Sequence, residues 1–327
     1  YWLILFSAWS FANLLGLNIS DSFKTAVTIY ILIPFLIIPQ LILSGIIVKF
    51  DKLNPAISSP NSIPWYGEII TARWAYEALA VYQFKDNKYE EIFYPYDKIM
   101  SITNYKKDYW LKSLQNKVIS VQRNLDKPGR KEDVKNDLRV LRNEISRELS
   151  TNNKISFNQV NNLYYDLIDK EVIAYTKNYF ELLKRYYIKR YNKANELKDR
   201  KVSSFQKTDE EKEQFLLLKK NYMNKSLEDM VTNANSIDRI VEFKGRLIQK
   251  IDPVYQDPEQ NSFIKAHFYA PRKVLFGRFV DTFWVNIIVI WFMTVLLYVT
   301  LYYRALKRLL DTFERFNIRF RKKQSPG

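Results

Sequence analysis

Three apolar runs and one long polar block organise this chain. The run from Thr25 to Val48 contains 24 residues without a charge. As a helix it would reach about 36 Å, enough to cross a hydrocarbon layer roughly 30 Å thick. Phe279–Tyr303 is a second such run with one acid, Asp281, near its start, and Tyr1–Leu17 is a shorter apolar and aromatic run. We interpret all three as membrane spans, and the absence of Met at position 1 suggests a piece of a larger polypeptide.

Between the second and third runs lie 230 residues of mostly polar character, from Lys49 to Arg278. Pro55, Pro60 and Pro64 interrupt the start of this block, so a continuous helix is not expected there. Trp65–Phe84 follows as an amphipathic segment rich in aromatic residues. Because Trp and Tyr favour the membrane interface, we expect this segment to be re-entrant or interfacial.

From about Asn104 to Lys250 the apolar positions recur with helical spacing. One face is formed by Val134, Leu138, Leu141, Ile145 and Leu149. A longer helix is predicted from about Phe157 to Arg200, and Pro128-Gly129 predicts a break between helices. Thr208 and Glu211 have the spacing of a capping box, which predicts the start of another helix.

The predicted fold is an all-α membrane protein with three transmembrane helices and a large helical extracytoplasmic insertion. Its parts are two spans joined by a short cytoplasmic turn (1–48), a Pro-rich and aromatic re-entrant or interfacial segment (49–103), a helical extracytoplasmic domain (104–278), the last span (279–303) and a basic cytoplasmic tail helix (304–327). The turn between the first two spans is expected at Asn18–Lys24. The tail helix has Leu306, Leu309, Leu310, Phe313 and Phe316 on one side, as expected for a helix that lies on anionic lipid.

Charge sets the expected orientation. The tail from Arg304 to Gly327 carries eight basic and two acidic residues, a net charge of +6 beside a span. The positive-inside rule places such a tail in the cytoplasm, so the polar block lies outside. The block itself has a net charge of +11, which does not oppose this orientation because long loops translocate largely regardless of charge. We expect a multi-pass protein of the bacterial inner membrane.

The composition leaves little room for chemistry in this chain. Cysteine is absent and His267 is the one histidine, so thiol catalysis and Zn-thiolate sites are excluded, and His267 is expected to form ordinary hydrogen bonds. No G-x-x-x-x-G-K-[ST] loop and no EF-hand spacing occurs. We therefore expect neither a catalytic site nor a metal site in this chain, and whether the protein is an enzyme depends on domains outside it.

The most specific signal lies between Ile33 and Phe84. Its pieces are, in order, Phe35-Leu36-Ile37-Ile38-Pro39-Gln40-Leu41-Ile42-Leu43-Ser44-Gly45-Ile46-Ile47-Val48, Ile63-Pro64-Trp65-Tyr66 and Arg73-Trp74-Ala75-Tyr76-Glu77-Ala78-Leu79. This order resembles the last third of the transmembrane domain of ABC exporters of the G type, also called ABC-2 or type V exporters. In that family a penultimate span ends in a small-residue step and a bulky apolar pair, followed by a loop that dips back toward the membrane and an aromatic helix. The long polar block departs from the family, whose last external loop is usually far shorter.

The resemblance implies that the three spans are the fourth, fifth and sixth of that fold and that Ile46 and Ile47 form a gate. Hydrophobic constrictions of this kind close a pathway by excluding water. From the residues alone, ordinary packing or lipid contact is favoured over a gate for two Ile side chains at a helix end. The residues expected along a substrate pathway are Pro34, Ile38, Gln40 and Leu41. Those expected to shape the re-entrant or interfacial segment are Trp65, Arg73, Trp74 and Glu77.

Two of these expectations have alternatives. A proline kink near Pro34 either lines a cavity or bends the helix passively, and Gln40 either contacts substrate or bonds a neighbouring helix. Arg73 and Glu77 have the i,i+4 spacing of an ion pair, which favours a structural role over substrate contact.

The resulting hypothesis is the permease portion of an ATP-driven ABC exporter for a lipid-like or amphipathic substrate. It implies an ATP-binding cassette domain, fused or associated, that holds ATP and Mg, and no cofactor in this chain. The other expected partners are a second permease copy forming a homodimer, membrane lipids and a periplasmic or envelope protein; nucleic acid is not expected. One alternative is a membrane-anchored scaffold or sensor whose extracytoplasmic helical domain binds an envelope partner. Another is an exporter of the mechanotransmission type, although there the external domain follows the first span.

Overall fold

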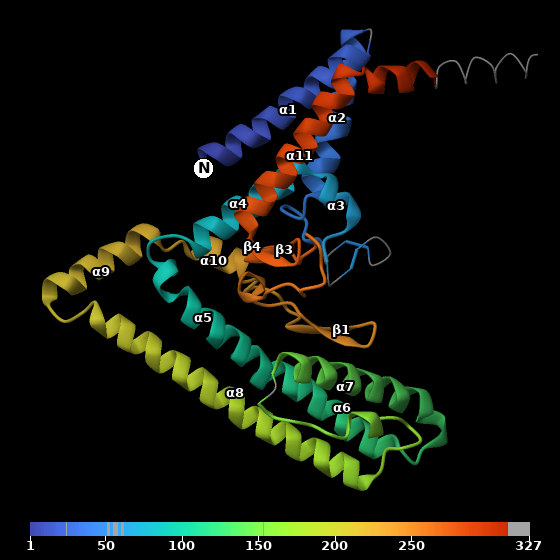
Figure 1. Ribbon diagram of the computed structural model, residues 1–327, viewed down its shortest axis with the longest axis vertical. Helices are drawn as coiled ribbons and strands as arrows, with labels where there is room; N and C mark the ends of the chain where they lie inside the picture. The colour runs from blue at the N-terminus through green and yellow to red at the C-terminus, as the bar shows by residue number, and fades with distance from the viewer. Residues whose placement is uncertain (24, 51–52, 55–57, 60–61, 153, 313–327) are drawn as a thin grey trace, which may run out of the picture. The chain divides into compact units, whose positions relative to one another are not determined.

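The computed structural model describes residues 1–23, 25–50, 53–54, 58–59, 62–152 and 154–312. It divides into two compact units, whose elements are labelled in Figure 1. Unit 1 consists of Tyr1–Tyr82 and Asp257–Gly327, and unit 2 consists of Gln83–Gln256. Unit 2 therefore starts earlier and ends earlier than the predicted helical domain at 104–278.

Unit 1 contains the three helices that are long and apolar enough to cross a membrane: α1 (Trp2–Ser22), α2 (Ala26–Leu43) and α11 (Thr282–Tyr302). Two shorter helices, α3 (Trp65–Ile69) and α4 (Thr71–Lys85), follow α2. Strands β3 (Arg272–Leu275) and β4 (Arg278–Asp281) form an antiparallel hairpin that leads directly into α11. The prediction of a mainly helical fold is confirmed, and three of its helices are long and apolar enough to cross a membrane, as expected.

The spans α1 and α11 lie side by side in Figure 1 and run parallel. Near the start of both, Ile4 packs in one cluster with Ile287 and Ile290. Further along, the Asn18 side-chain amide donates to the backbone oxygen of Leu297 at 3.0 Å. The shared direction agrees with the predicted path, in which both helices cross the membrane the same way.

The span boundaries differ from the predicted ones for local reasons. The turn predicted at Asn18–Lys24 is wrong, because α1 continues to Ser22. Its polar end is stabilised by α11, since Thr300 donates to Asn18 at 3.0 Å and Arg304 pairs with Asp21 at 2.7 Å. The second span ends at Leu43 rather than Val48, and the third begins at Thr282 because the residues before it form β4.

Two predicted segments fall partly outside the described residues. Of the prolines before the aromatic segment, Pro55 and Pro60 lie outside them, and Pro64 is the N-cap residue of α3. The tail is helical at residues 305–312, and the rest of the predicted tail helix, with Phe313 and Phe316, lies outside the described residues.

Unit 2 is built from long helices that pack on one another (Figure 1). The helix α5 (Glu90–Tyr105) continues through a π-helical turn, η2 (Lys106–Trp110), into α6 (Leu111–Asn124). The remaining helices are α7 (Lys131–Thr151), α8 (Lys170–Ser204), α9 (Asp209–Tyr222) and α10 (Lys225–Val231). Contacts of α6 with α7, and of α8 with α5 and α6, form the main layer of the unit.

The core of unit 2 includes the face predicted for α7. Val134, Leu138, Leu141 and Ile145 are buried and belong to one apolar cluster with residues of α6 and α8. The predicted break at Pro128-Gly129 is a short 3-10 turn, η3 (Pro128–Arg130), between α6 and α7. The predicted capping box is present at the start of α9, where Thr208 accepts from the backbone of Glu211.

Two predictions of helix in unit 2 are wrong. The helix expected from Phe157 starts only at Lys170, because Asp169 caps α8 by accepting from the backbone of Val172 at 2.7 Å. Near the end of the unit, β1 (Ile240–Phe243) and β2 (Arg246–Gln249) form an antiparallel hairpin. Its two-residue turn, Lys244-Gly245, has positive φ at both positions, which is the geometry that tight hairpins require.

Candidate functional site

The bend after α2 carries the predicted gate. The Ser44 hydroxyl donates to the backbone oxygen of Leu41 at 2.9 Å and accepts from the backbone amide of Ile46 at 3.3 Å. Gly45 between them has φ +78°, in the left-handed region that glycine adopts at little cost. Ile46 and Ile47 therefore lie in a bend beyond the helix, not on the end of the helix as expected. Ile46 is half-buried, whereas Ile47 is 67% exposed.

An aromatic ring closes this bend. The Phe50 ring fills the space into which a side chain at Gly45 would project, and a β-carbon at Gly67 would lie 2.9 Å from the same ring. Phe50 is buried and also contacts the rings of Tyr66 and Phe268. Gly45 thus permits a close approach, and the group that approaches is a ring of the same chain. Phe50 and Gly67 were not singled out from the sequence, because their contact depends on how the loop folds back.

The predicted pathway residues lie on α2, which runs through Pro34 and Pro39 without a break. At about 100° per residue, Pro34, Ile38 and Leu41 share one face of the helix, and Gln40 lies about 120° away from them. Pro34, Ile38 and Leu41 are exposed and Gln40 is half-buried. No residue of α2 is buried, so the described part of the chain does not bring these four residues together with another element.

A buried cluster of charges ties α4 to β3 and α11. One carboxylate oxygen of Glu77 accepts from the Lys273 ammonium at 2.6 Å, the Arg73 guanidinium at 3.0 Å and the Asn286 amide at 3.0 Å. Arg73 also pairs with Glu68 at 2.5 Å. The side chains of Arg73 and Glu77 are wholly buried and Lys273 is nearly so. The ion pair expected for Arg73 and Glu77 is present, as part of this larger cluster.

The electrostatics of the cluster favour ionised partners at neutral pH. Burial lowers the pKa of Lys273 to about 8, and the attraction of Glu77 limits this fall. Burial raises the pKa of Glu77, but the charges of Lys273 and Arg73 together outweigh it, so the pKa is held below its usual value. Burial raises the pKa of Glu68, and the charge of Arg73 opposes that rise. A buried pair of this kind is costly to break, because either partner alone would be a buried charge without compensation.

The two tryptophans predicted to be interfacial differ in placement. Trp65 is exposed and therefore free to lie in an interface. Trp74 is buried between cations, with the Arg73 guanidinium 3.7 Å and the Lys273 ammonium 4.2 Å from its ring centroid. Its indole N–H donates to the backbone oxygen of Glu68 at 2.8 Å. Arg73, Trp74 and Glu77 lie in the interior of unit 1, and their expected part in shaping a re-entrant or interfacial segment stays a prediction.

Lys273 and Glu68 complete the cluster but were not identified as site residues from the sequence. Lys273 is 196 positions from Glu77, and a lysine in a short alternating segment carries no local sign of burial. Asn286, near the start of α11, also belongs to the cluster, and its amide donates to the backbone oxygen of Trp74 at 2.9 Å.

Unit 2 contains a second group of charges, around a cavity of ≈ 400 Å³. Glu90 is buried there, and Asp97 pairs with Lys198 at 2.5 Å. Burial raises the pKa of Glu90 to about 7, and the negative charges of Asp97 and Glu228 add to the rise. Within the described residues, no group of three or more His, Asp or Glu side chains is placed to hold a metal ion.

The chain matches no protein-family model, no curated protein and no solved structure. The structure and composition define a mainly helical chain in which three helices are long and apolar enough to cross a membrane. The likeness to G-type exporters rests on residues 33–84 of the sequence and stays a prediction.

Proposed function

We propose that this chain is the transmembrane permease portion of an ATP-driven ABC exporter that moves a lipid-like or amphipathic substrate across the bacterial inner membrane. In this proposal unit 2 lies on the outer side and the tail on the cytoplasmic side. An ATP-binding cassette domain, fused or associated, supplies the energy, and two permease copies enclose the pathway. A periplasmic or envelope protein is a further partner for unit 2.

The observation that supports this proposal is that every residue of the apolar helix α2 is at least partly exposed. The helix is apolar and contains two prolines, yet none of its residues is buried. A simple anchor needs only to contact lipid, and prolines weaken the backbone hydrogen bonds of a helix in lipid unless neighbouring groups replace them. A helix at the interface between two copies of the protein has such neighbours.

The geometry beyond α2 supports a gate at this interface. Gly45 turns the chain, and the buried Phe50 ring fixes the turn, so that Ile47 projects outward with its side chain exposed. Two such side chains from two copies would form an apolar constriction that excludes water. The buried cluster around Glu77 would then hold α4 and α11 rigidly while α2 moves.

Crosslinking tests the arrangement. These 327 residues contain no cysteine, so Ile47→Cys introduces one thiol at a defined position, and the mass of the crosslinked product shows whether it has paired with a second copy. Oxidation in native membranes should give a crosslinked dimer, since a disulfide requires the two Cα atoms to lie within about 7 Å. Ile288→Cys, at an exposed position of α11, is the matched control and should remain monomeric. Equal crosslinking of both variants would remove the gate assignment.

Transport activity tests the mechanism. In the complete transporter reconstituted with its ATPase, Ile46→Ala combined with Ile47→Ala should increase leak or basal ATP hydrolysis, because the smaller side chains no longer close the constriction. Ile288→Ala with Leu296→Ala removes the same volume from exposed positions of α11 and should leave both unchanged. If no ATPase co-isolates with the native protein, the anchored scaffold or sensor replaces the exporter.

A further inference from the structure

A cleft between the end of α7 and the middle of α8 gathers four cations. It has a volume of ≈ 730 Å³. Its basic lining residues are Lys154, Lys189, Arg190 and Lys193, and its remaining lining residues are Thr151, Asn152 and Tyr186. Tyr186, Lys189, Arg190 and Lys193 are spaced i, i+3, i+4 and i+7, which places them on one face of α8. We call this region the basic cleft.

The charges of the basic cleft are not compensated. All four cations are exposed, and none has an ion-pair partner in the described part of the chain. From Leu182 to Asn195, α8 carries five basic residues and no acid. Like charges at i,i+4, such as Lys189 and Lys193, destabilise a helix by about 0.2–0.5 kcal/mol per pair. The four cations therefore repel one another in the folded protein, and a bound anion would reduce this repulsion.

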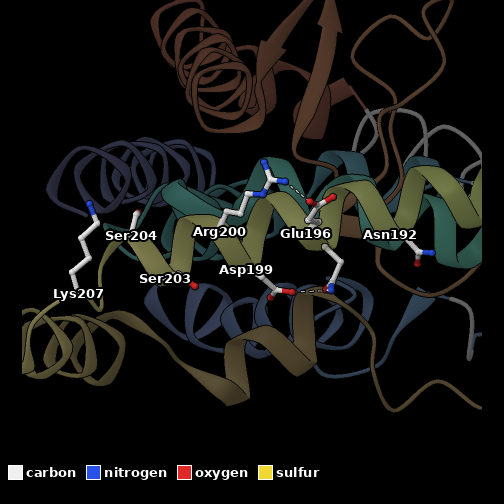
Figure 2. Close-up of a pocket in the computed structure, with 8 residues that line it drawn as sticks. Asn192, Glu196, Asp199, Arg200, Ser203, Ser204 and Lys207 are labelled. Atoms are coloured by element: carbon white, nitrogen blue, oxygen red, sulfur yellow. Dashed lines mark hydrogen bonds and ion pairs between the residues drawn. The ribbon is translucent and has the colours of Figure 1, made fainter.

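In a second pocket, further along α8, basic side chains lie beside acidic ones (Figure 2). It has a volume of ≈ 590 Å³ and contains residues of both signs. There Arg200 pairs with Glu196, and the Asn195 amide donates to Asp199 at 3.1 Å. The charges of that pocket are largely satisfied within the helix, whereas those of the basic cleft face solvent together.

The buried acid near the end of α7 is already engaged. Glu148, on the last turns of α7, is buried and accepts from the Lys106 ammonium at 2.9 Å and from the Tyr187 hydroxyl. It also accepts at 3.1 Å from the amide of Asn152, which lines the basic cleft. Because Lys106 neutralises Glu148, this carboxylate does not offset the four cations of the cleft.

We infer that the basic cleft binds a phosphate-bearing anion. Phosphate oxygens accept several hydrogen bonds at once, and three lysines with one arginine supply many N–H donors from a small area. The arginine adds a planar fork that fits two phosphate oxygens, and the lysines act as point charges. The inference goes beyond the exporter proposal and stands if that proposal fails, because it depends on unit 2 alone.

Calorimetric titration of the full-length chain in a neutral detergent tests this site, with tripolyphosphate and inorganic phosphate as probes. We expect saturable binding of tripolyphosphate that weakens as salt rises, because exposed charges are screened over about 10 Å at 0.1 M ionic strength. The triple variant Lys189→Gln/Arg190→Gln/Lys193→Gln should weaken binding at least tenfold. Arg190→Lys, which keeps the charge, should have a smaller effect than Arg190→Gln.

A matched control separates this site from the general positive charge of the chain. Lys112→Gln/Lys170→Gln/Lys220→Gln removes the same charge from three exposed and dispersed positions of unit 2, and it should change the affinity less than twofold. If both triple variants weaken binding equally, attraction is diffuse and the inference is wrong. If the site triple variant does not fold, as judged by circular dichroism, Arg190→Gln against Lys112→Gln gives the same comparison.

A second experiment distinguishes lipid headgroups from soluble molecules as the phosphate-bearing ligand. The chain in phosphatidylcholine nanodiscs is mixed with separate vesicles of phosphatidylglycerol or of phosphatidylcholine and sedimented. Co-sedimentation with phosphatidylglycerol vesicles that the site triple variant abolishes assigns the cleft to lipid headgroups. Binding of tripolyphosphate without vesicle binding assigns it to a soluble phosphate-bearing ligand. Absence of saturable binding in both arms overturns the inference.

Discussion

Replacement of Glu77 by Gln tests whether the buried charge cluster holds unit 1 together. The change keeps the shape of the side chain but removes the negative charge that faces Lys273 and Arg73. Arg73 retains Glu68, whereas Lys273 loses the carboxylate it contacts. Leaving a buried charge without its partner costs about 3–5 kcal/mol. For a domain of this size, that corresponds to a fall of roughly 6–20 °C in the unfolding temperature.

Thermal unfolding in detergent, followed by tryptophan fluorescence, measures the effect, since Trp74 lies against both cations. The matched control is Glu132→Gln, which breaks the exposed pair with Lys135 and should cost no more than about 1 kcal/mol. A shift for Glu77→Gln no larger than that of the control would refute the reasoning.

Two further properties of the Glu77→Gln variant follow from the charges. Adding Lys273→Met should recover part of the lost stability, because the double variant leaves no unpaired cation in the cluster. The single variant should also lose less stability at pH 9 than at pH 7, because Lys273 without Glu77 has a pKa below about 8 and sheds its charge. Additive losses in the double variant, or a loss independent of pH, would contradict the assigned role of Lys273.

The remaining predictions concern three separate features. The pKa of Glu90 is about 7 in the folded protein, compared with 4.5 for the ordinary carboxyl group. Ionisation of Glu90 therefore destabilises the fold increasingly as pH rises from 4.5, and fully above pH 7. Thermal unfolding should show that Glu90→Gln stabilises the protein by about 2 kcal/mol at pH 8 and has no effect at pH 4. Gly45→Ala should cost at least about 1–2 kcal/mol through its positive φ and the contact with the neighbouring ring, whereas Gly16→Ala, in a helix with open space around it, should be neutral or stabilising. For topology, a membrane-impermeant thiol reagent should label Glu213→Cys in intact spheroplasts and Thr312→Cys only after lysis; the reverse pattern would invert the orientation.

Local features of the chain were predictable because they depend on neighbouring residues. About 20 apolar residues in succession suffice to indicate a span, and α1, α2 and α11 were located this way. The capping box at Thr208 and the buried face of α7 also follow from spacings of three and four residues. The β1–β2 hairpin was missed, because its short strands lie in a region where helical spacing dominated the pattern.

In the candidate site, too, the features that depend on neighbouring residues were predictable and the others were not. The i,i+4 spacing of Arg73 and Glu77 predicted their ion pair. The burial of that pair was not predictable, since aromatic residues around it indicated an interface. The roles of Ile46 and Ile47 as a gate stay a prediction, although their place in a bend beyond α2 is now defined.

The amino-acid sequence alone indicated three segments long and apolar enough to cross a membrane and a long polar insertion between the last two, because the free energy of placing a segment in lipid depends on its own side chains. Only the tertiary structure decided which charges are buried and paired and which remain exposed together. Glu77 and Lys273 are 196 positions apart, and within the described residues the cations of the basic cleft have no ion-pair partner, while Glu148 near the end of α7 is paired with Lys106. Such pairings depend on which elements come into contact in the fold, and the local pattern of residues does not encode them.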